Sequence, residues 1–171
     1  MKIVLLGYMG CGKSEISKSL SKLYQINRID LDDYIENKEA MPISEIFKQK
    51  GEIYFRNLET ACLTEILQTK EGFILSLGGG TPCFGTNMQL VNKWAISIYL
   101  NAKIPTLVQR LLPEKDKRPL IARVSNEDLP EFIGKHLFER NVFYTQAQLQ
   151  VSVDDKSVDA IVLEIKETLS K

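Results

Sequence analysis

Residues 7–14 read Gly-Tyr-Met-Gly-Cys-Gly-Lys-Ser and follow directly on the apolar run Ile3–Leu6. The pattern G-x-x-x-x-G-K-S between a strand-like and a helix-like segment is typical of a phosphate-binding loop. Glycines in such a loop allow successive backbone N–H groups to turn toward one anion at the start of a helix. The sequence therefore predicts that the phosphates of a nucleotide bind at residues 7–14.

Two side chains of this loop have separate predicted roles. Lys13 is expected to contact the terminal phosphates as a point charge. The Ser14 hydroxyl is expected to ligate the Mg²⁺ that accompanies a nucleoside triphosphate. The alternative, a glycine-rich turn that binds nothing, is disfavoured because four fixed positions and both flanks fit the pattern.

A second Mg²⁺ determinant of nucleotide-binding proteins is an apolar strand that ends in Asp, but the apolar run Phe73–Leu77 has no Asp. Three aspartates, Asp30, Asp32 and Asp33, instead follow another short strand-like segment. Asp30 and Asp32 alternate, so both are expected to project toward one site and to supply the carboxylate on the metal side. The alternative is a solvated acidic turn in which one Asp caps a helix.

Three consecutive glycines, Gly78–Gly80, follow the run Phe73–Leu77. Each costs roughly 0.5–1 kcal/mol of backbone entropy relative to alanine, which favours close approach of a ligand over a merely flexible turn. Two arginines are further candidates: Arg56, with Glu59 one helical turn later to orient it, and Arg140. On their own these arginines would be interpreted as surface residues.

The segment Pro113–Arg123 contains Lys115, Lys117 and Arg118 and two prolines, and it is predicted to be an exposed loop. A solvated run of charge is the simple interpretation. The alternative is a mobile lid that excludes water and brings Arg118 onto the transferring phosphate, where a cation stabilises the spread charge.

These residues need elements to position them, and the hydrophobic pattern predicts five strands that alternate with helices. Such alternation indicates a parallel sheet with helices on both faces, and ligands bind beyond the carboxyl ends of its strands. The predicted strands are Lys2–Leu6, Arg28–Asp30, Gly72–Leu77, Ala95–Leu100 and Leu149–Val153. The predicted helices include 13–24, 52–68, 86–92, 105–112, 126–146 and 157–169.

The composition of the 171 residues is that of one domain with an apolar core, at 44% hydrophobic and 26% charged residues. The 22 basic and 22 acidic residues balance, so charge gives no case for binding nucleic acid or a membrane surface. Three cysteines without a CxxC pair fit neither a disulfide framework nor a zinc site, and reduced thiols indicate the cytoplasm. The only histidine, His136, is expected to be structural.

Taken in order, the motifs resemble the shikimate kinase family over nearly the whole chain. The similarity rests on G-x-M-G-x-G-K-S at 7–14, D-x-D at 30–32, F-R-x-x-E at 55–59, G-G-G at 78–80, R-P-L at 118–120 and E-R-x-x-x-Y at 139–144. The resemblance implies an ATP-dependent kinase that phosphorylates the 3-hydroxyl of shikimate, on the route to aromatic amino acids. It also implies one P-loop kinase domain, 1–171, of the nucleoside-monophosphate-kinase-like type. That fold is a three-layer α/β/α domain with a five-stranded parallel sheet, a substrate-binding helical segment at about 32–62 and a mobile lid at about 112–124.

The resemblance also assigns roles to residues. Lys13, Asp32 and Arg118 would be catalytic, and Ser14 would hold one Mg²⁺ per subunit with Asp30 acting through water. The subunit is expected to be a monomer with no nucleic-acid or membrane partner. The ATP-binding residues would be Gly10, Cys11, Gly12, Lys13, Ser14, Glu15, Arg110 and Arg118, and the shikimate-binding residues would be Asp32, Arg56, Gly78, Gly79, Gly80 and Arg140.

The chain departs from the family pattern in two places. Residues 153–157 are acidic and short where a basic adenine-side loop is common, and Thr81-Pro82 replaces small residues after the glycines. Another small-molecule kinase of the same fold, such as a gluconate kinase, remains the alternative. A nucleoside monophosphate kinase is disfavoured because no contact set for a second nucleotide is evident. A nucleotide-binding module without catalysis is disfavoured because Lys13, Asp32 and Arg118 are all present.

Overall fold

The computed structural model describes residues 1–170 and contains five parallel strands in the order β2-β3-β1-β4-β5. This arrangement confirms the predicted parallel sheet. β2 and β3 lie on one side of β1, and β4 and β5 lie on the other, so the chain reverses its direction across the sheet after β3 and creates a switch point. The strands are β1 (Lys2–Leu6), β2 (Asn27–Asp30), β3 (Phe73–Ser76), β4 (Ile96–Asn101) and β5 (Leu149–Ser152).

The central strands are the most apolar because helices cover both of their faces. β1 and β3 are almost wholly buried, and their continuous apolar sequences reflect this position. The strand β2 lies at one edge and exposes Asn27 and Arg28 to solvent. Burial thus explains why the first and third strands were clear from the sequence, while the second was short and polar.

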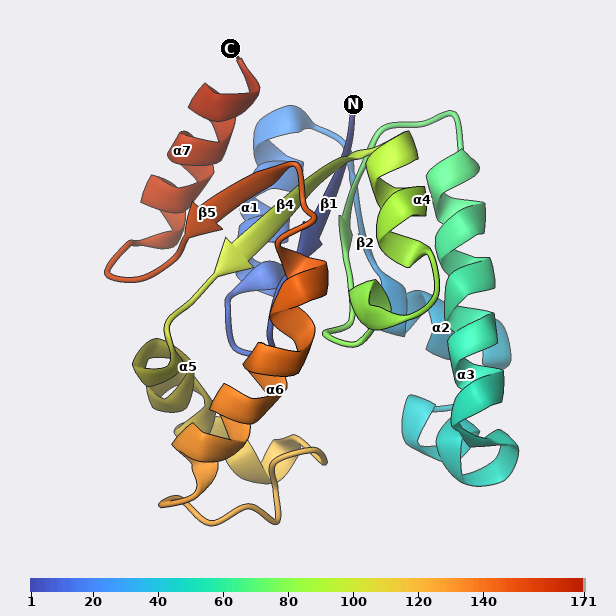
Figure 1. Cartoon of the computed structure of the whole chain (residues 1–171). Helices are drawn as coiled ribbons and strands as arrows, with labels where there is room; N and C mark the ends of the chain where they lie inside the picture. Colours follow the sequence, from blue (N-terminus) through green and yellow to red (C-terminus); the bar gives the residue numbers. More distant parts are fainter. Residues whose placement is uncertain (171) are drawn as a thin grey trace.

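The helices form layers on the two faces of the sheet (Figure 1). α1 packs against α7 on one face, and α3 packs against α4 on the other, while α5 and α6 pack together beside the sheet's lower end. The layers confirm the predicted α/β/α arrangement. The helices are α1 (Lys13–Tyr24), α2 (Leu31–Glu39), α3 (Ile43–Gln68), α4 (Asn87–Trp94), α5 (Ile104–Leu111), α6 (Leu129–Tyr144) and α7 (Val158–Leu169), with 3₁₀ helices η1 (Thr81–Cys83) and η2 (Leu112–Lys117).

The carboxyl ends of β1, β2 and β3 meet at the lower end of the sheet in Figure 1. The phosphate loop follows β1, Asp30 ends β2, and the glycine triplet Gly78–Gly80 comes just after β3. Parallel pairing aligns Asp30 of β2 with Ser76 of β3. Three chemically unusual segments from distant parts of the sequence are therefore brought to one edge.

Gly51 has φ 81° and ψ 171°, which breaks α3 into two helical pieces, and the second piece agrees with the predicted helix 52–68. Two details differ from the sequence-based expectations. The first half of the expected loop at 113–123 is the 3₁₀ helix η2, and Ile121 beyond it is fully buried. The helix α6 begins at Leu129 because residues 119–128 form turns anchored by Ile121. No helix in residues 1–170 is long and apolar enough to cross a membrane.

Candidate active site

The phosphate loop adopts the backbone geometry that its glycines permit. Gly10 and Gly12 have φ values of 81° and 101°, which side chains other than glycine rarely adopt. Gly12 is the N-cap of α1, so the free N–H groups of the first helical turn point toward the preceding loop. A helix start with free N–H groups and a positive dipole end binds phosphate.

The ammonium group of Lys13 lies back over its own loop. Its Nζ atom donates hydrogen bonds to the carbonyl oxygens of Gly7 and Tyr8, at 2.8 and 3.1 Å. The backbone N–H of Cys11, a residue expected to contact ATP, also donates to the Tyr8 carbonyl, at 3.2 Å. Lys13 thus sits at the mouth of the loop with its charge uncompensated by any carboxylate within 4 Å in residues 1–170.

A cavity of about 450 Å³ joins the phosphate loop to the ends of β2 and β3. It brings together most of the residues expected to bind ATP and the metal, together with Asp32 and two of the three glycines of the triplet. Its lining residues are Met9, Gly10, Gly12, Lys13, Ser14, Glu15, Asp30, Asp32, Leu77, Gly78, Gly79, Arg110, Glu114 and Arg118.

The two aspartates of this cavity have different surroundings. Asp30 is the N-cap of α2 and accepts a hydrogen bond from the Asp32 N–H, at 3.0 Å, so the helix-capping alternative holds for Asp30 as well. Burial and the nearby Asp33 carboxylate raise the pKa of Asp30 above its usual value. For Asp32, burial and then the neighbouring carboxylates Asp30 and Glu59 raise the pKa to about 6. A carboxylate that titrates near neutral pH is suited to accept a proton.

The triplet Gly78–Gly80 lies against three side chains that were predicted to bind the substrate. A β-carbon on the first glycine would lie 2.9 Å from Oδ1 of Asp32, and one on the second would lie 3.1 Å from Nη1 of Arg140. One on the third would lie 2.7 Å from Nη2 of Arg56. All three distances are shorter than normal contacts of a side-chain carbon, so each glycine leaves room for one predicted substrate-binding residue.

Arg56 is held by a buried acid one turn further along α3. Its Nη1 atom donates to Oε2 of Glu59 at 2.8 Å, as predicted, and Glu59 is only 1% exposed. The guanidinium carbon also lies 5.3 Å from the centre of the Phe55 ring. Nη2 has no hydrogen-bond acceptor in residues 1–170, and Nε faces only the exposed Glu52, with Oε1 at 3.8 Å, so Nη2 is available to a ligand carboxylate.

Arg140 projects from α6 toward the same glycine triplet. Its guanidinium carbon lies 5.6 Å from the centre of the Tyr8 ring. One turn further along, the buried Tyr144 donates a hydrogen bond to the Gly79 carbonyl at 2.6 Å. Tyr144 therefore ties the glycine loop to the helix that carries Arg140, and both guanidinium groups reach the loop from opposite directions.

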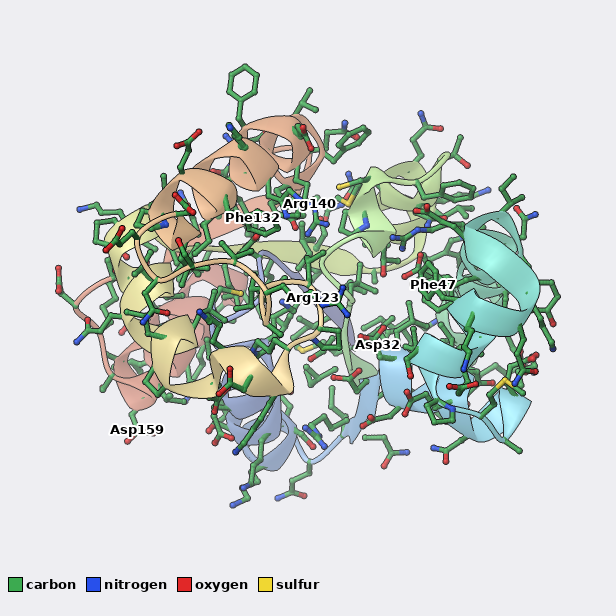
Figure 2. The ribbon with its side chains drawn as sticks, turned by 90° about the horizontal axis from the view of Figure 1, so that it is seen from below. Asp32, Phe47, Arg123, Phe132, Arg140 and Asp159 are labelled. Carbon is green, nitrogen blue, oxygen red and sulfur yellow. The ribbon has the colours of Figure 1, made fainter. Side chains whose placement is uncertain are left out.

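Figure 2 looks onto this end of the molecule. In that view, Asp32 from α2 and Arg140 from α6 lie on either side of the centre, with Arg123 between them. Phe47 of α3 lies on the Asp32 side. The ring of Phe47 packs against that of Phe55 at a centroid distance of 4.5 Å, so an aromatic pair lies beside Arg56 on the α3 wall.

The cations expected on the ATP side are placed on two neighbouring elements. Arg118, which follows η2, lines the cavity and pairs with Glu114 at 3.0 Å. Arg110 of α5 donates to the carbonyl oxygens of Cys11 and Val153, each at 3.3 Å. Arg110 thus links the phosphate loop to the short acidic segment 153–157, where the family commonly has a basic adenine-side loop.

Oxygen atoms suited to Mg²⁺ lie around the phosphate loop. Ser14 and Asp30 line the cavity, and the hydroxyl of Ser76, the register partner of Asp30, is buried without a hydrogen-bond partner in residues 1–170. Residues 1–170 contain no group of three or more His, Cys, Asp or Glu side chains that could hold a metal ion. This donor set fits Mg²⁺, which takes few protein ligands and keeps waters and phosphate oxygens.

Three contacts at the site were not assigned from the sequence. Tyr144, the last residue of the E-R-x-x-x-Y motif, donates a hydrogen bond to the Gly79 carbonyl, and the motif alone predicted no role for it. Glu114 is four residues before Arg118, a helical spacing that could have indicated the pair. Thr81, noted only as a departure, donates to Glu59.

The only histidine has a structural environment, as expected. Its Nδ1 atom lies 3.2 Å from the Tyr8 hydroxyl, and its ring packs on Phe132 at 4.4 Å between centroids. Burial and the Arg140 charge lower the pKa of His136. The histidine is therefore mainly neutral at pH 7 and supports the Tyr8 ring behind Arg140.

Comparisons with known proteins point to one family. The shikimate kinase family model matches residues 9–170. The shikimate kinase of Flavobacterium johnsoniae is 51% identical over 99% of both chains, and that of Flavobacterium psychrophilum is 46% identical over 98% of both. The crystal structure of shikimate kinase from Bacteroides thetaiotaomicron matches with a TM-score of 0.93 and 34% identity, covering 100% of this chain and 99% of that one. Shikimate kinase from Acinetobacter baumannii in complex with shikimate matches with a TM-score of 0.88 and 27% identity, covering 99% and 92%.

Proposed function

Because the chain belongs to the shikimate kinase family, we propose that it transfers the γ-phosphoryl group of ATP to the 3-hydroxyl group of shikimate. The products are shikimate 3-phosphate and ADP, on the route to chorismate and aromatic amino acids. One observation carries the assignment beyond the family. The glycine triplet Gly78–Gly80 makes room for one carboxylate and two guanidinium groups beside a phosphate-binding loop.

The acceptor half of the site matches a small polyhydroxy acid. Arg56 and Arg140 approach the triplet from α3 and α6, and two guanidinium groups suit one carboxylate because each presents parallel N–H donors. Asp32 approaches from α2 and suits hydroxyl groups, since a carboxylate accepts their hydrogen bonds. Shikimate carries one carboxylate and three hydroxyl groups, so its two ends match the two kinds of side chain.

Asp32 is the proposed proton acceptor. With a pKa of about 6 it is mainly ionised at pH 7.5 and close enough to neutrality to take a proton. As the 3-hydroxyl oxygen bonds to the γ-phosphorus, the bond from that phosphorus to the β,γ-bridging oxygen breaks, and the hydroxyl proton passes to the Asp32 carboxylate. Lys13 and Arg118 stabilise the negative charge on the phosphoryl oxygens during this step.

The metal side is proposed to consist of Ser14 as a direct ligand and Asp30 through water, with one Mg²⁺ per subunit. The ion, when bound, neutralises phosphate charge and orients the β- and γ-phosphates. Asp30 also accepts the Asp32 N–H, so it fixes the start of α2 and with it the position of the proton acceptor.

Several features of the whole chain are part of the same proposal. Residues 1–171 form one P-loop kinase domain in which about 32–62 bind the acceptor and about 112–124 act as a lid. The Arg118–Glu114 pair lies at the cavity, with side chains 37% and 53% exposed, so solvent weakens it and phosphate can compete for the guanidinium group. We further propose a cytoplasmic location, because the three cysteines are free thiols, and a monomeric subunit.

The alternative is a gluconate kinase, which would also need a carboxylate clasp and hydroxyl contacts. The paired arginines and Asp32 around one rigid triplet favour a compact cyclic acid over an open-chain one. ADP release with shikimate or gluconate as the acceptor separates the two.

A further inference from the structure

Glu59 is a buried acid, and each of its two carboxylate oxygens accepts a hydrogen bond. Oε2 accepts from Nη1 of Arg56 at 2.8 Å, and Oε1 accepts from the hydroxyl of Thr81 at 2.5 Å. Glu59 is 1% exposed and Thr81 is 0% exposed. A buried carboxylate is stable only when its oxygens are hydrogen-bonded, so the threonine hydroxyl fixes the plane that faces the arginine.

The backbone of Thr81 also accepts a buried hydrogen bond. The side-chain amide of Asn87, also fully buried, donates to the Thr81 carbonyl at 2.9 Å. The amide oxygen of Asn87 accepts from the hydroxyl of Thr60, the residue after Glu59, at 3.0 Å. These contacts link α3, η1 and the start of α4, and they hold the backbone of Thr81 where its hydroxyl can reach Glu59.

The same hydroxyl lies beside the acceptor pocket. The point where a β-carbon of Gly78 would sit is 3.2 Å from Oγ1 of Thr81 and 2.9 Å from Oδ1 of Asp32. The Glu59 carboxylate is also one of the groups that raise the pKa of Asp32. The threonine therefore stands between the acid that holds Arg56 and the residue that faces the reacting hydroxyl.

We propose that Thr81 is a positioning residue for shikimate, which acts through Glu59 to fix the Arg56 guanidinium group for the substrate carboxylate. The inference rests on the proposed function and adds to it a residue outside the direct substrate contacts. Recognition of a carboxylate by two parallel N–H bonds requires the guanidinium plane to be set in advance. Without the hydroxyl, Glu59 keeps one partner, its carboxylate rotates, and Arg56 loses that plane.

The test compares Thr81→Val, which removes the hydroxyl at nearly constant volume, with Thr81→Ser, which keeps it. Thr64→Val is the matched control, because Thr64 is on the same helix as Glu59 and its hydroxyl bonds only to the Thr60 carbonyl. Shikimate and ATP affinities are measured by calorimetry, and kcat and KM by ADP release. Thr81→Val should weaken shikimate binding by about tenfold or more, as loss of a hydrogen bond to a charged group does.

The other readouts separate positioning from general damage. In Thr81→Val, ATP affinity should stay within about twofold of wild type, and KM for shikimate should rise by more than kcat falls. Thr81→Ser and Thr64→Val should bind shikimate within about threefold of wild type. With the methyl ester of shikimate, which lacks the carboxylate charge, wild type and Thr81→Val should bind equally weakly, because Arg56 no longer has a charged partner.

Equal weakening of shikimate, its ester and ATP by Thr81→Val would overturn the proposal, as would unchanged shikimate binding. Circular dichroism and the melting temperature report whether the variant is folded. If Thr81→Val does not fold, Thr81→Cys, which keeps the size with only a weak donor, should show the same selective loss of shikimate binding. The proposed function itself fails only if wild type does not phosphorylate shikimate, so the two failures are distinct.

Discussion

The guanidinium group of Arg56 lies where a side chain on Gly80 would have to go, with Nη2 2.7 Å from the position of a β-carbon. Gly80 has φ −90° and ψ −20°, a conformation that any residue adopts. The glycine is therefore required by the arginine and not by the backbone. A substitution at Gly80 therefore tests how strongly binding of the substrate carboxylate depends on the position of the Arg56 guanidinium group.

Replacing Gly80 by alanine should displace the Arg56 guanidinium without straining the turn. We expect the KM for shikimate to rise on the order of 10- to 100-fold, since an error of about 1 Å in a positioning group can cost that much. The KM for ATP should stay within about twofold. Gly134→Ala on α6 is the control, because its β-carbon would make an ordinary 3.4 Å contact with Ile104. Steady-state kinetics in which Gly80→Ala equals wild type would show that the guanidinium is not needed at this position.

Substitutions of Arg140 and of Lys13 should change different kinetic parameters. Arg140→Ala removes one half of the carboxylate clasp and should raise the KM for shikimate by about 10- to 150-fold. Lys13→Ala removes a charge from the transferring phosphate and should lower kcat on the order of 10²- to 10³-fold. Steady-state kinetics with each substrate varied in turn distinguish the two. Loss of ATP binding alone in both variants would mean that Arg140 is on the donor side.

Ionisation of Asp32 should make the ligand-free protein less stable at neutral pH than at about pH 4. Its folded pKa of about 6 exceeds the unfolded value, so the unfolded chain loses the proton first as the pH rises from about 4 to 6. This contribution therefore lowers the free energy of unfolding through that window and is constant above it. Asp32→Asn should raise the free energy of unfolding by roughly 1–3 kcal/mol at pH 7.5 and by little at pH 4.

Urea denaturation at the two pH values measures this difference. Asp116→Asn, at an exposed residue of η2, is the control and should change the free energy of unfolding by less than about 0.5 kcal/mol at either pH. If Asp32→Asn changed the free energy of unfolding equally at both pH values, burial would not raise the pKa of Asp32.

The metal assignment predicts that Asp30→Asn weakens the response to Mg²⁺. Asparagine keeps the N-cap hydrogen bond to residue 32 and removes only the charge, so α2 should remain intact. The Mg²⁺ concentration for half-maximal activity should rise about tenfold or more, as it does when an outer ligand is lost. Asp159→Asn, at an exposed residue of α7, is the control. Identical Mg²⁺ titrations of Asp30→Asn and wild type would place the metal elsewhere.

Much of the site was visible in the sequence because its parts lie in short contiguous motifs. The Gly-Lys-Ser loop and the glycine triplet each follow an apolar run that is buried in the sheet, and burial makes such runs easy to recognise. The prediction that Asp30 and Asp32 face one site is confirmed by the cavity that both line, although Asp32 lies in α2 and not in a strand. The resemblance to one family then assigned the arginines, which no local pattern distinguishes from surface residues.

The remainder depends on contacts between distant residues. The Thr81–Glu59 bond joins positions 22 apart, and the Tyr144–Gly79 bond joins positions 65 apart. All four residues lie in or beside motifs, but no pattern in the sequence shows which of them are paired. The start of α6 was placed too early because Ile121 draws residues 119–128 into turns, and that burial is a tertiary effect. Sequence patterns show which elements exist, and packing decides where irregular segments lie.

The most direct test of the account is ADP release in a coupled assay with ATP, Mg²⁺ and a panel of acceptors. We expect shikimate to stimulate release far above the rate without an acceptor, and gluconate and nucleoside monophosphates to leave that rate unchanged. Folding of the sample is checked by its melting temperature. Folded protein whose ADP release does not respond to shikimate, or responds better to gluconate, would contradict the assignment of Asp32, Arg56 and Arg140 to the acceptor.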